Sequence, residues 1–369
     1  MLREIVWDYI MEILKFVKKV TPPFVTGTVI TPSGAEQRVS TTWSRQDRWG
    51  MIRSRISAFR MAYSVEPGLY AVGSPTKDSE VFVTANYKLT FDVLRRSLTR
   101  MAAWVLVLDT KSINVWCAAG KGTFGTDELL RRIGLVKLDS IVEHRRIILP
   151  QLGAVGVSAS EVQKRTGFRV IFGPVDARDI PAYLAAGRKK TKEMSTARFG
   201  ILERLVLTPM EINPAMKKYP WFALGILVVF GLQPSGILFE SAWHNGMTFL
   251  LLGFLAVLCG AFVTPVLLPY VPFRSFAVKG WIVGMAAVAG SMLFLDPVPL
   301  RNVLLMVSAY ALFPVLSSYI ALQFTGSTTF TGMSGVKKEL KIGIPIYGTA
   351  TAVSLVLLVV YKLKEWGVL

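Results

Sequence analysis

The sequence predicts an α/β domain followed by an all-α transmembrane domain, and three observations support this. Hydrophobic residues make up 52% of the 369 residues, yet the formal net charge is +18. From about Ser79, short apolar runs alternate with helical stretches, a pattern typical of a Rossmann-like parallel sheet. After Pro220, apolar segments approach the roughly 20 residues needed to span a bilayer. We therefore expect an α/β domain over residues 1–212 and a transmembrane domain of five helices over residues 213–369.

The elements of the α/β domain follow from its apolar runs and capping residues. Thr126 and Ser160 are expected to cap two helices, and Gly167 to end the second. Ligands of parallel sheets bind beyond the carboxyl ends of the strands, so the functional residues are expected in the loops that follow the strands. Strands are predicted over 24–31, 81–83, 105–108, 147–149 and 170–172, and helices over 92–100, 126–134, 160–165 and 179–186.

The transmembrane prediction also gives an orientation. Loop lysines and arginines number seven on one side of the predicted spans and three on the other. Because positive residues gather on the cytoplasmic side, this places the α/β domain in the cytoplasm, against the inner membrane. The first segment is interrupted by Gln233–Pro234–Ser235–Gly236, so it is expected to be kinked, short or partly re-entrant. The five segments are 221–239, 247–268, 276–295, 303–324 and 346–361.

Charge and the first 20 residues point to a membrane surface. Residues 213–369 carry ten Lys or Arg and four Asp or Glu, which leaves 32 and 20 in residues 1–212. Membrane proximity accounts for this excess better than nucleic-acid binding, because no nucleic-acid module accompanies it. The N-terminal stretch is broken by Arg3 and Asp8, so it is predicted to be an amphipathic helix rather than a signal peptide.

The chain contains two cysteines, Cys117 and Cys259. Two cysteines exclude a disulfide framework and a cysteine-rich iron–sulfur site carried by this chain alone. Cys259 lies in a hydrophobic run and is interpreted as a packing residue. Taken alone, Cys117 would also be interpreted as a core cysteine. A phosphate-binding loop at Gly120–Lys121 is excluded, because the motif requires glycine at 115 and Ser or Thr at 122.

A longer motif around Cys117 changes that interpretation. The run NVWCAAGKGTFGTDEL, residues 114–129, resembles the cap-helix motif of the mercury-methylating corrinoid protein family. Residues 325–339 and VTANYKLTFD at 83–92 also resemble that family. LPQLGA at 149–154 and FGPVDA at 172–177 resemble loops of the corrinoid-binding domain of the corrinoid iron–sulfur protein of acetyl-CoA synthesis. That protein lacks the cysteine and carries its own cluster, so the present chain is more similar to the mercury-methylating branch.

The resemblance implies a cofactor, a site and a reaction. Cys117, in the cap-helix segment 114–121, would be the catalytic residue and the lower axial ligand of a corrinoid cobalt. Its thiolate is a strong donor, which favours departure of a methyl group with its bonding electrons towards Hg(II), forming methylmercury. Asn114 and Lys121 are candidates for hydrogen bonds that tune the thiolate. The implied cofactor-binding set is Thr84, Asn86, Asn114, Val115, Trp116, Cys117, Ala118, Ala119, Gly120, Lys121, Gly122, Gly153 and Ala177.

The resemblance also implies partners. A ferredoxin-like protein with two [4Fe–4S] clusters would return electrons and deliver Hg(II), and a methyltetrahydrofolate-type donor would supply the methyl group. Two alternatives remain open at this point. One is a membrane-bound corrinoid methyl carrier of one-carbon metabolism. The other is a non-catalytic membrane protein such as a transporter. It is disfavoured because, apart from Lys279 near one end, the predicted spans contain no ionisable residue at mid-depth that would mark a transport pathway.

Overall fold

The computed structural model describes residues 22–324 and 333–369, and these form two compact units. The first unit contains residues 22–54 and 58–197, and the second contains 55–57, 198–324 and 333–369. The division at 197/198 lies somewhat before the predicted domain boundary at 212/213. The predicted N-terminal amphipathic helix and residues 325–332 of the motif at 325–339 lie outside the described residues.

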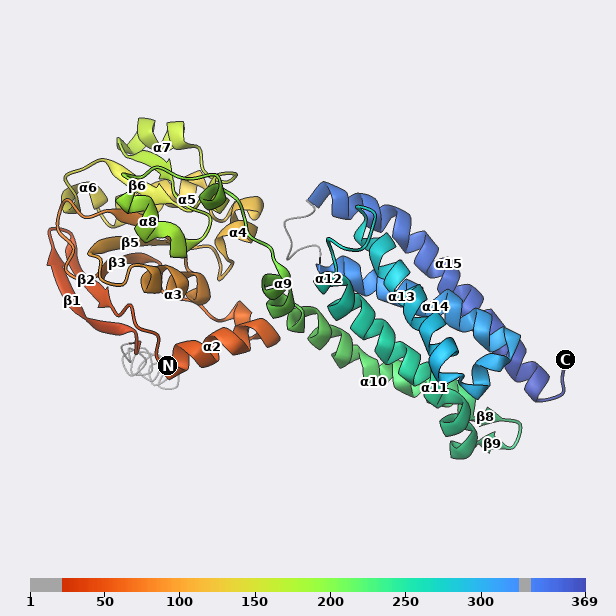
Figure 1. Cartoon of the computed structure of the whole chain (residues 1–369). Helices are drawn as coiled ribbons and strands as arrows, with labels where there is room; N and C mark the ends of the chain where they lie inside the picture. The colour runs from red at the N-terminus through yellow and green to blue at the C-terminus, as the bar shows by residue number, and fades with distance from the viewer. Residues whose placement is uncertain (1–21, 325–332) are drawn as a thin grey trace, which may run out of the picture. The chain divides into compact units, whose positions relative to one another are not determined.

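The first unit is built on a seven-stranded sheet with the order β1-β2-β3-β5-β4-β6-β7 (Figure 1). Strands β5, β4, β6 and β7 run parallel, as predicted. The complete sheet is mixed and mostly parallel, because β1 pairs antiparallel with β2 and β3 pairs antiparallel with β5. The strands are β1 Val25–Thr31, β2 Gly34–Val39, β3 Gly68–Val72, β4 Val81–Ala85, β5 Ala103–Leu108, β6 Arg146–Leu149 and β7 Arg169–Phe172.

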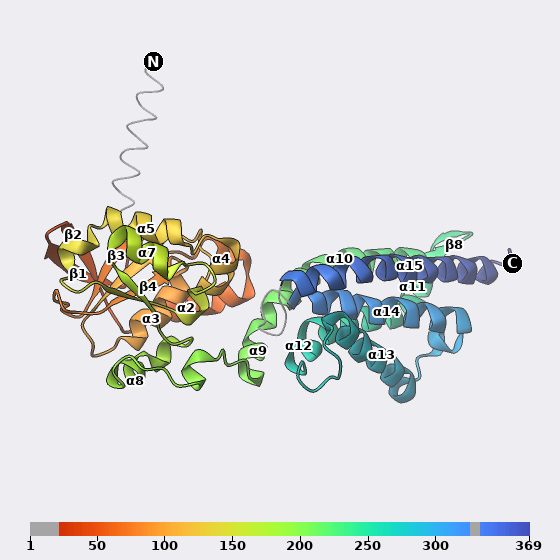
Figure 2. The same ribbon diagram turned by 90° about the horizontal axis from the view of Figure 1, so that it is seen from above.

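Helices cover both faces of the sheet (Figures 1 and 2). Every residue of β4 and β5 is buried, as expected for strands between two helical layers. One core packs α4, α5, α6 and α7 on the sheet, and the other packs α3 and α8 on the opposite face. The helices are α2 Arg45–Ile56, α3 Lys88–Ser97, α4 Val115–Lys121, α5 Thr126–Leu135, α6 Leu138–Ile141, α7 Ala159–Thr166 and α8 Ile180–Ala185.

The helices predicted over 126–134, 160–165 and 179–186 end within a residue of the observed ones, whereas the helix predicted over 92–100 is α3, which begins at Lys88 and ends at Ser97. Two cap assignments also need correction. Gly125, not Thr126, is the N-cap of α5, and the Thr126 hydroxyl instead accepts a hydrogen bond from the Ser158 amide at 2.9 Å. Ser158, not Ser160, caps α7 through a bond from the Glu161 amide. Gly167 ends α7 in the left-handed conformation with φ +75°, as predicted.

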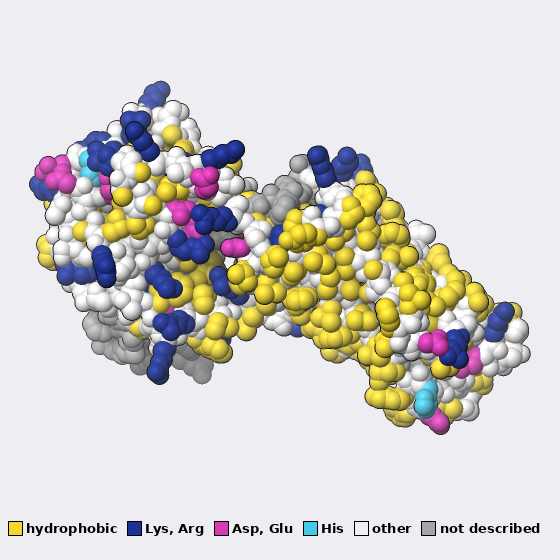
Figure 3. All heavy atoms as spheres, viewed as in Figure 1, with side chains coloured by type: hydrophobic (Ala, Val, Ile, Leu, Met, Phe, Trp, Pro, Cys, Tyr) yellow, Lys and Arg dark blue, Asp and Glu magenta, His cyan; other side chains and the backbone are white. Residues whose placement is uncertain are grey.

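The second unit is a helical bundle whose visible face is largely hydrophobic, with charged side chains gathered at its ends (Figure 3). Among the described residues, four helices are long and apolar enough to cross a membrane: Phe239–Val266, Phe276–Leu295, Val303–Gln323 and Gly335–Glu365. The helices of the second unit are α9 Ile201–Leu207, α10 Pro209–Gly231, α11 Phe239–Leu258, a π-helical turn Cys259–Val263, α12 Thr264–Val266, α13 Phe276–Leu295, α14 Val303–Gln323 and α15 Met333–Glu365.

The first of the five predicted spans is not a single helix. Segment 221–239 contains the end of α10 and a two-stranded hairpin, β8 Leu232–Gln233 and β9 Gly236–Ile237. The interruption seen at Gln233–Pro234–Ser235–Gly236 is therefore a turn that reverses the chain. A fifth span stays a prediction.

Small residues allow close packing between α13 and α14. A Cβ on Gly280 would lie 2.6 Å from Ala321 Cβ, and one on Gly284 would lie 2.7 Å from Pro314 Cα. The Ser317 hydroxyl donates to the Gly280 carbonyl at 2.8 Å. Such small-residue contacts and interhelical hydrogen bonds are typical of helices that associate in lipid. Cys259 is buried at the π-helical turn, in agreement with its predicted packing role.

Candidate functional site

The parallel part of the sheet has a topological switch point between β4 and β6. The chain passes from β4 through α3 to β5 on one side, and then returns to β6 on the other side of β4. In open α/β sheets, ligands bind at the carboxyl ends of the strands beside such a point. The loops after β4, β5 and β6 all lie at this edge, and α4 follows β5 there.

Helix α4 presents two different faces. Val115, Ala118 and Ala119 are buried in the core beneath it. Cys117 is half-buried, and Trp116 is 39% exposed. Gly120, Lys121 and Gly122 are exposed as well. The small buried residues thus seat the helix on the domain, while Cys117 belongs to the outer part of its surface.

The cap of α4 fixes the backbone at Cys117. The Asn114 side-chain oxygen accepts a hydrogen bond from the Cys117 amide at 2.9 Å. The side-chain oxygen of Asn114 serves as the N-cap of α4, and its predicted role in tuning the thiolate stays a prediction. At the other end, Gly122 adopts φ +81° and its amide donates to the Ala119 carbonyl. A left-handed glycine of this kind terminates the helix one residue after Lys121.

Asn86, after β4, shapes the loop that leads into α4. Its side-chain oxygen accepts from the Thr110 amide at 3.1 Å, the Thr110 hydroxyl at 2.9 Å and the Ser112 amide at 3.0 Å. Its side-chain nitrogen donates to Asp109 at 3.4 Å. Asn86 thus positions the loop that leads to Asn114 and α4. Its predicted contact with a cofactor stays a prediction.

The same loop contains two non-glycine residues in the left-handed region, Lys111 at φ +58° and Ser112 at φ +59°. Such conformations are unfavourable for residues with a Cβ and persist where surrounding contacts enforce them. The Asp109 carboxylate accepts from the Lys111 amide at 3.1 Å, and Asn86 accepts from the Ser112 amide. These two acceptors hold the strained turn that aims the chain into α4.

Glu128 of α5 supports the loop from the other side. Its carboxylate accepts from the Asp109 amide at 2.9 Å and pairs with Arg132 at 2.8 Å and Arg131 at 2.7 Å. Burial would raise the pKa of this carboxyl, but the hydrogen bonds from Arg131, Asp109 and Arg132 outweigh it, and the pKa is lowered. The ionised carboxylate of Glu128 therefore holds the backbone at Asp109, where the loop begins.

Two glycines of the loop after β6 are required by close packing. A Cβ on Gly153 would lie 2.5 Å from the Phe124 ring. A Cβ on Gly156 would lie 2.2 Å from the Phe124 carbonyl oxygen and 3.1 Å from Ala119 Cα. Gly153, predicted to contact a cofactor, thus lets the loop after β6 lie against Phe124, just beyond α4.

Gly120 differs from these two. A Cβ on it would meet nothing within 4 Å, and its φ is not in the left-handed region. Neither packing nor backbone conformation within the described chain requires glycine here. Because Gly120 has no side chain and Cys117 is half-buried, the outer surface of α4 has free space at these two positions.

Thr84 and Ala177, the remaining predicted site residues, are associated with the other face of the sheet. Strand alternation places Thr84 on the same face as Phe82, towards α3. Ala177 begins a 3-10 helix, Ala177–Asp179, and packs against the core on that face. The structure thus brings Asn86 and the loop of Gly153 to the α4 side, whereas Ala177 packs in the opposite layer.

One feature near the site was missed by the sequence reasoning: a buried cluster of four charged residues. Lys88 lies 2.8 Å from Asp47 and 2.6 Å from Asp92, while Arg95 lies 2.8 Å from Asp47 and 2.7 Å from Asp92. Burial would raise the pKa of Asp47, but hydrogen bonds from Lys88 and Ser44 hold it well below its usual range. The i, i+4 spacing of Lys88 and Asp92 was a visible signal, but the distant partner Asp47 had none. The cluster joins α2 to the start of α3, and α3 begins two residues after Asn86.

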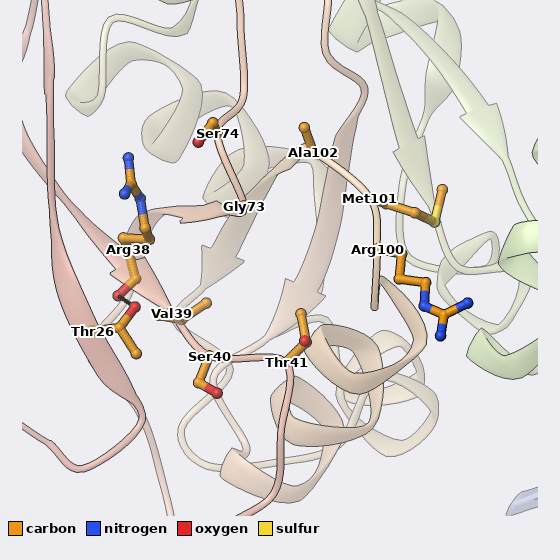
Figure 4. A pocket seen from close by; sticks show the side chains of 10 residues that line it. All are labelled: Thr26, Arg38, Val39, Ser40, Thr41, Gly73, Ser74, Arg100, Met101 and Ala102. Atoms are coloured by element: carbon orange, nitrogen blue, oxygen red, sulfur yellow. Dashed lines mark hydrogen bonds between the residues drawn. The ribbon is translucent and has the colours of Figure 1, made fainter.

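A shallow pocket lies at the other edge of the sheet, where β5 begins (Figure 4). It is lined by residues that follow β2 and β3 and precede β5, including Ser40, Ser74 and Ala102. Its two arginines, Arg38 and Arg100, point away from one another in Figure 4, so their guanidinium groups do not converge on one anion. The pocket is separate from the α4 site, which follows the carboxyl end of β5.

Comparisons with known proteins match the part of the chain that contains the α4 site. Residues 57–184 match the family model of the CO dehydrogenase/acetyl-CoA synthase delta subunit. The acetyl-CoA decarbonylase/synthase complex subunit gamma of Archaeoglobus fulgidus is 33% identical over 127 residues, 34% of this chain and 27% of that protein. The corrinoid/iron-sulfur protein large subunit of Moorella thermoacetica is 33% identical over 124 residues, 33% of this chain and 27% of that protein.

These matches cover one domain and not the whole chain. The chain spans about a quarter of the length of the curated relatives it matches, 27% in both cases above. Residues 57–184 therefore form a domain related to these subunits, and the helical bundle lies outside the matched region.

Proposed function

We propose that this chain is a membrane-anchored corrinoid protein that transfers a methyl group to Hg(II), forming methylmercury. The observation that carries the proposal is the outer face of α4. It combines a half-buried cysteine with an adjacent glycine that packing does not explain. The Moorella relative of the same domain is by name a corrinoid/iron-sulfur protein, which supports a corrinoid as the ligand.

The residues of α4 fit a large flat ligand of this kind. Gly120 and Gly122 leave room beside Cys117, and Trp116 offers an exposed aromatic side chain next to it. A soft thiol is a suitable ligand for a transition metal such as cobalt. A bound corrinoid would supply a methyl group for transfer to the soft acceptor Hg(II), and Cys117 would hold its cobalt as a strongly donating thiolate ligand.

The chain's own residues would hold and orient the thiolate. Asn114 fixes the Cys117 backbone amide, and Asn86 with Glu128 holds the strained loop before it. Val115, Ala118 and Ala119 bury the inner face of α4, so the helix cannot rotate to withdraw Cys117 without breaking the core. Lys121, on the exposed side, is available to a polar ligand group.

Methyl carriage within one-carbon metabolism is the second candidate. It is favoured by the relatives, whose names place them in acetyl-CoA decarbonylase/synthase complexes. Cys117 favours the first candidate, because the resemblance places a cobalt-ligating cysteine in the mercury-methylating branch. We further propose that the four apolar helices anchor the chain in the inner membrane with the α/β unit in the cytoplasm.

The proposal includes two partners. The chain has two cysteines, and among its described residues no group of three or more metal-ligating side chains occurs. We infer that a ferredoxin-like protein with two [4Fe–4S] clusters would supply the reducing equivalents. A methyltetrahydrofolate-type donor would restore the methyl group.

Anaerobic purification of the full chain followed by visible spectroscopy tests the proposal. We expect about one corrinoid per chain by the stoichiometry of a single axial ligand. The Cys117→Ala variant is expected to change the corrinoid spectrum. A purified, folded chain that binds no added corrinoid would refute the proposal. Corrinoid binding without Hg(II) methylation in the presence of a reductant and methyl donor would favour the methyl carrier instead.

A further inference from the structure

The outward face of α2 carries an apolar stripe. Trp49, Ile52 and Ile56 are exposed by 59%, 43% and 38%. Their spacing of three and four residues places them on one side of the helix. An exposed stripe of large apolar side chains is unusual on a water-exposed helix and marks an interaction surface.

Arginines border this stripe. Arg48 lies on one flank by helical spacing, and Arg45 lies in line with the stripe one turn before Trp49. Both guanidinium groups are cations. The surface thus combines apolar side chains with cations around them.

The opposite face of α2 is fixed to the domain, so the stripe cannot turn inwards. Asp47 is buried and pairs with Lys88 and Arg95 at 2.8 Å each. The Ser44 hydroxyl and amide both bind the Asp47 carboxylate, and the Asp47 amide donates back to the Ser44 hydroxyl. Gly50 packs against Tyr63, since a Cβ there would lie 2.3 Å from the Tyr63 hydroxyl oxygen.

The buried residues 47, 50 and 54 lie about half a turn away from the stripe residues 49, 52 and 56. The buried clamp therefore sets the rotation of α2 and commits its apolar stripe to the outside.

We propose that α2 docks in the headgroup region of an anionic bilayer. An apolar stripe with Trp and flanking cations is the pattern of a helix lying in a membrane interface. The arginines complement anionic headgroups, which attract basic segments near the surface. The same chain carries four helices long enough to span a membrane, so a bilayer is held close to it. The inference rests on the proposed membrane anchoring.

The test uses the full chain in vesicles, with both native cysteines replaced by alanine and one reporter cysteine added. Ile52→Cys carries a bimane label, and vesicles contain nitroxide-labelled phosphatidylcholine with or without phosphatidylglycerol. Ile30→Cys is the matched control, because Ile30 is exposed by 82% on β1. Leu251→Cys, at an exposed position of α11, reports membrane insertion independently.

We expect lipid quenching at position 52 in phosphatidylglycerol vesicles and not at position 30. The double variant Arg45→Gln/Arg48→Gln should weaken docking by about 30-fold, since each basic residue near an anionic surface contributes about a fivefold factor. Equal quenching at 52 and 30, or equal quenching at 52 in neutral and anionic vesicles, would overturn the proposal.

Two further outcomes separate the alternatives. Protection of position 52 from aqueous iodide without lipid quenching would mean that protein covers the stripe, and would also overturn the proposal. Quenching at 251 but not at 52 would refute docking alone. Absence of quenching at 251 would refute the membrane anchoring on which the proposal depends, and the docking proposal with it.

Discussion

Substitution of Gly120 separates the fold of α4 from its proposed use as a ligand platform. A side chain at this position has open space around it, since a Cβ would meet nothing within 4 Å. Gly156 is the matched control, because a Cβ there would lie 2.2 Å from the Phe124 carbonyl oxygen. The two glycines therefore differ in the space available to a side chain, which is open at Gly120 and blocked at Gly156.

The expected magnitudes follow from this geometry. Gly120→Ala should raise the free energy of unfolding by about 0.5–1 kcal/mol, because alanine favours a helix over glycine by that amount. Gly156→Ala should lower it by about 1–3 kcal/mol, the usual cost of overpacking. Gly120→Leu should keep the fold, yet weaken corrinoid binding by roughly 5- to 150-fold if the ring lies over α4 and meets a clash of similar size.

Corrinoid content per chain, from visible spectra of anaerobically prepared protein, measures binding. Urea unfolding followed by near-ultraviolet circular dichroism measures the fold in parallel. Gly120→Leu with normal stability and normal corrinoid content would refute the placement of the corrinoid over the outer face of α4. Gly156→Ala with normal stability would instead refute the packing argument that distinguishes the two glycines.

Four further predictions concern other parts of the molecule. Cys117→Ala should abolish Hg(II) methylation with the fold and membrane insertion intact, and Cys117→His should be nearly as damaging. Methylmercury yield, corrinoid content and protein level are measured together. An alanine variant that methylates Hg(II) at the parent rate would return Cys117 to a packing role. Asp47→Asn should cost about 3–5 kcal/mol in urea unfolding, because it removes one partner of a buried charged cluster, and a cost below about 1 kcal/mol would contradict this. The lowered pKa of Glu128 contributes stability that is present above the ordinary pKa of 4.5 and is lost as pH falls through the lowered pKa of the folded state. Glu128→Gln should therefore flatten the acid limb of a stability–pH profile and leave its neutral and alkaline parts parallel to those of the parent. Reporter fusions should place Lys337 and Lys338 on the cytoplasmic side, and an outside location would overturn the predicted topology.

The sequence predicted the parts of the fold that depend on local patterns. The runs at β4, β5, β6 and β7 are short, apolar and bounded by polar residues, so their strands were found within a residue or two. Left-handed glycine at 167 is likewise a local signal. Cap assignment was less accurate, because Ser158 and Ser160 are both chemically able to cap α7 and only the tertiary contact with Thr126 distinguishes them.

The sheet direction and the first apolar segment could not be obtained this way. Whether β3 runs antiparallel to β5 depends on pairing between strands more than 30 residues apart, which no local pattern encodes. Segment 221–239 has the composition of a span, but its first half is the end of α10 and its second half is the hairpin β8–β9. Apolar composition alone cannot predict a turn that reverses the chain.

The site shows the same division between local and distant information. The motif at 114–121 identified α4 and Cys117, but the motif residues do not by themselves orient the helix. Orientation comes from Asn86, directly after β4, and from Glu128 on the next helix, which together hold the strained turn before Asn114. The sequence shows the Asn86 amide and the Glu128 carboxylate, but it does not show which residues they bind. The residues that position Cys117 are therefore as necessary to the proposed chemistry as the residues around it, and substitutions at Asn86 should displace the thiol.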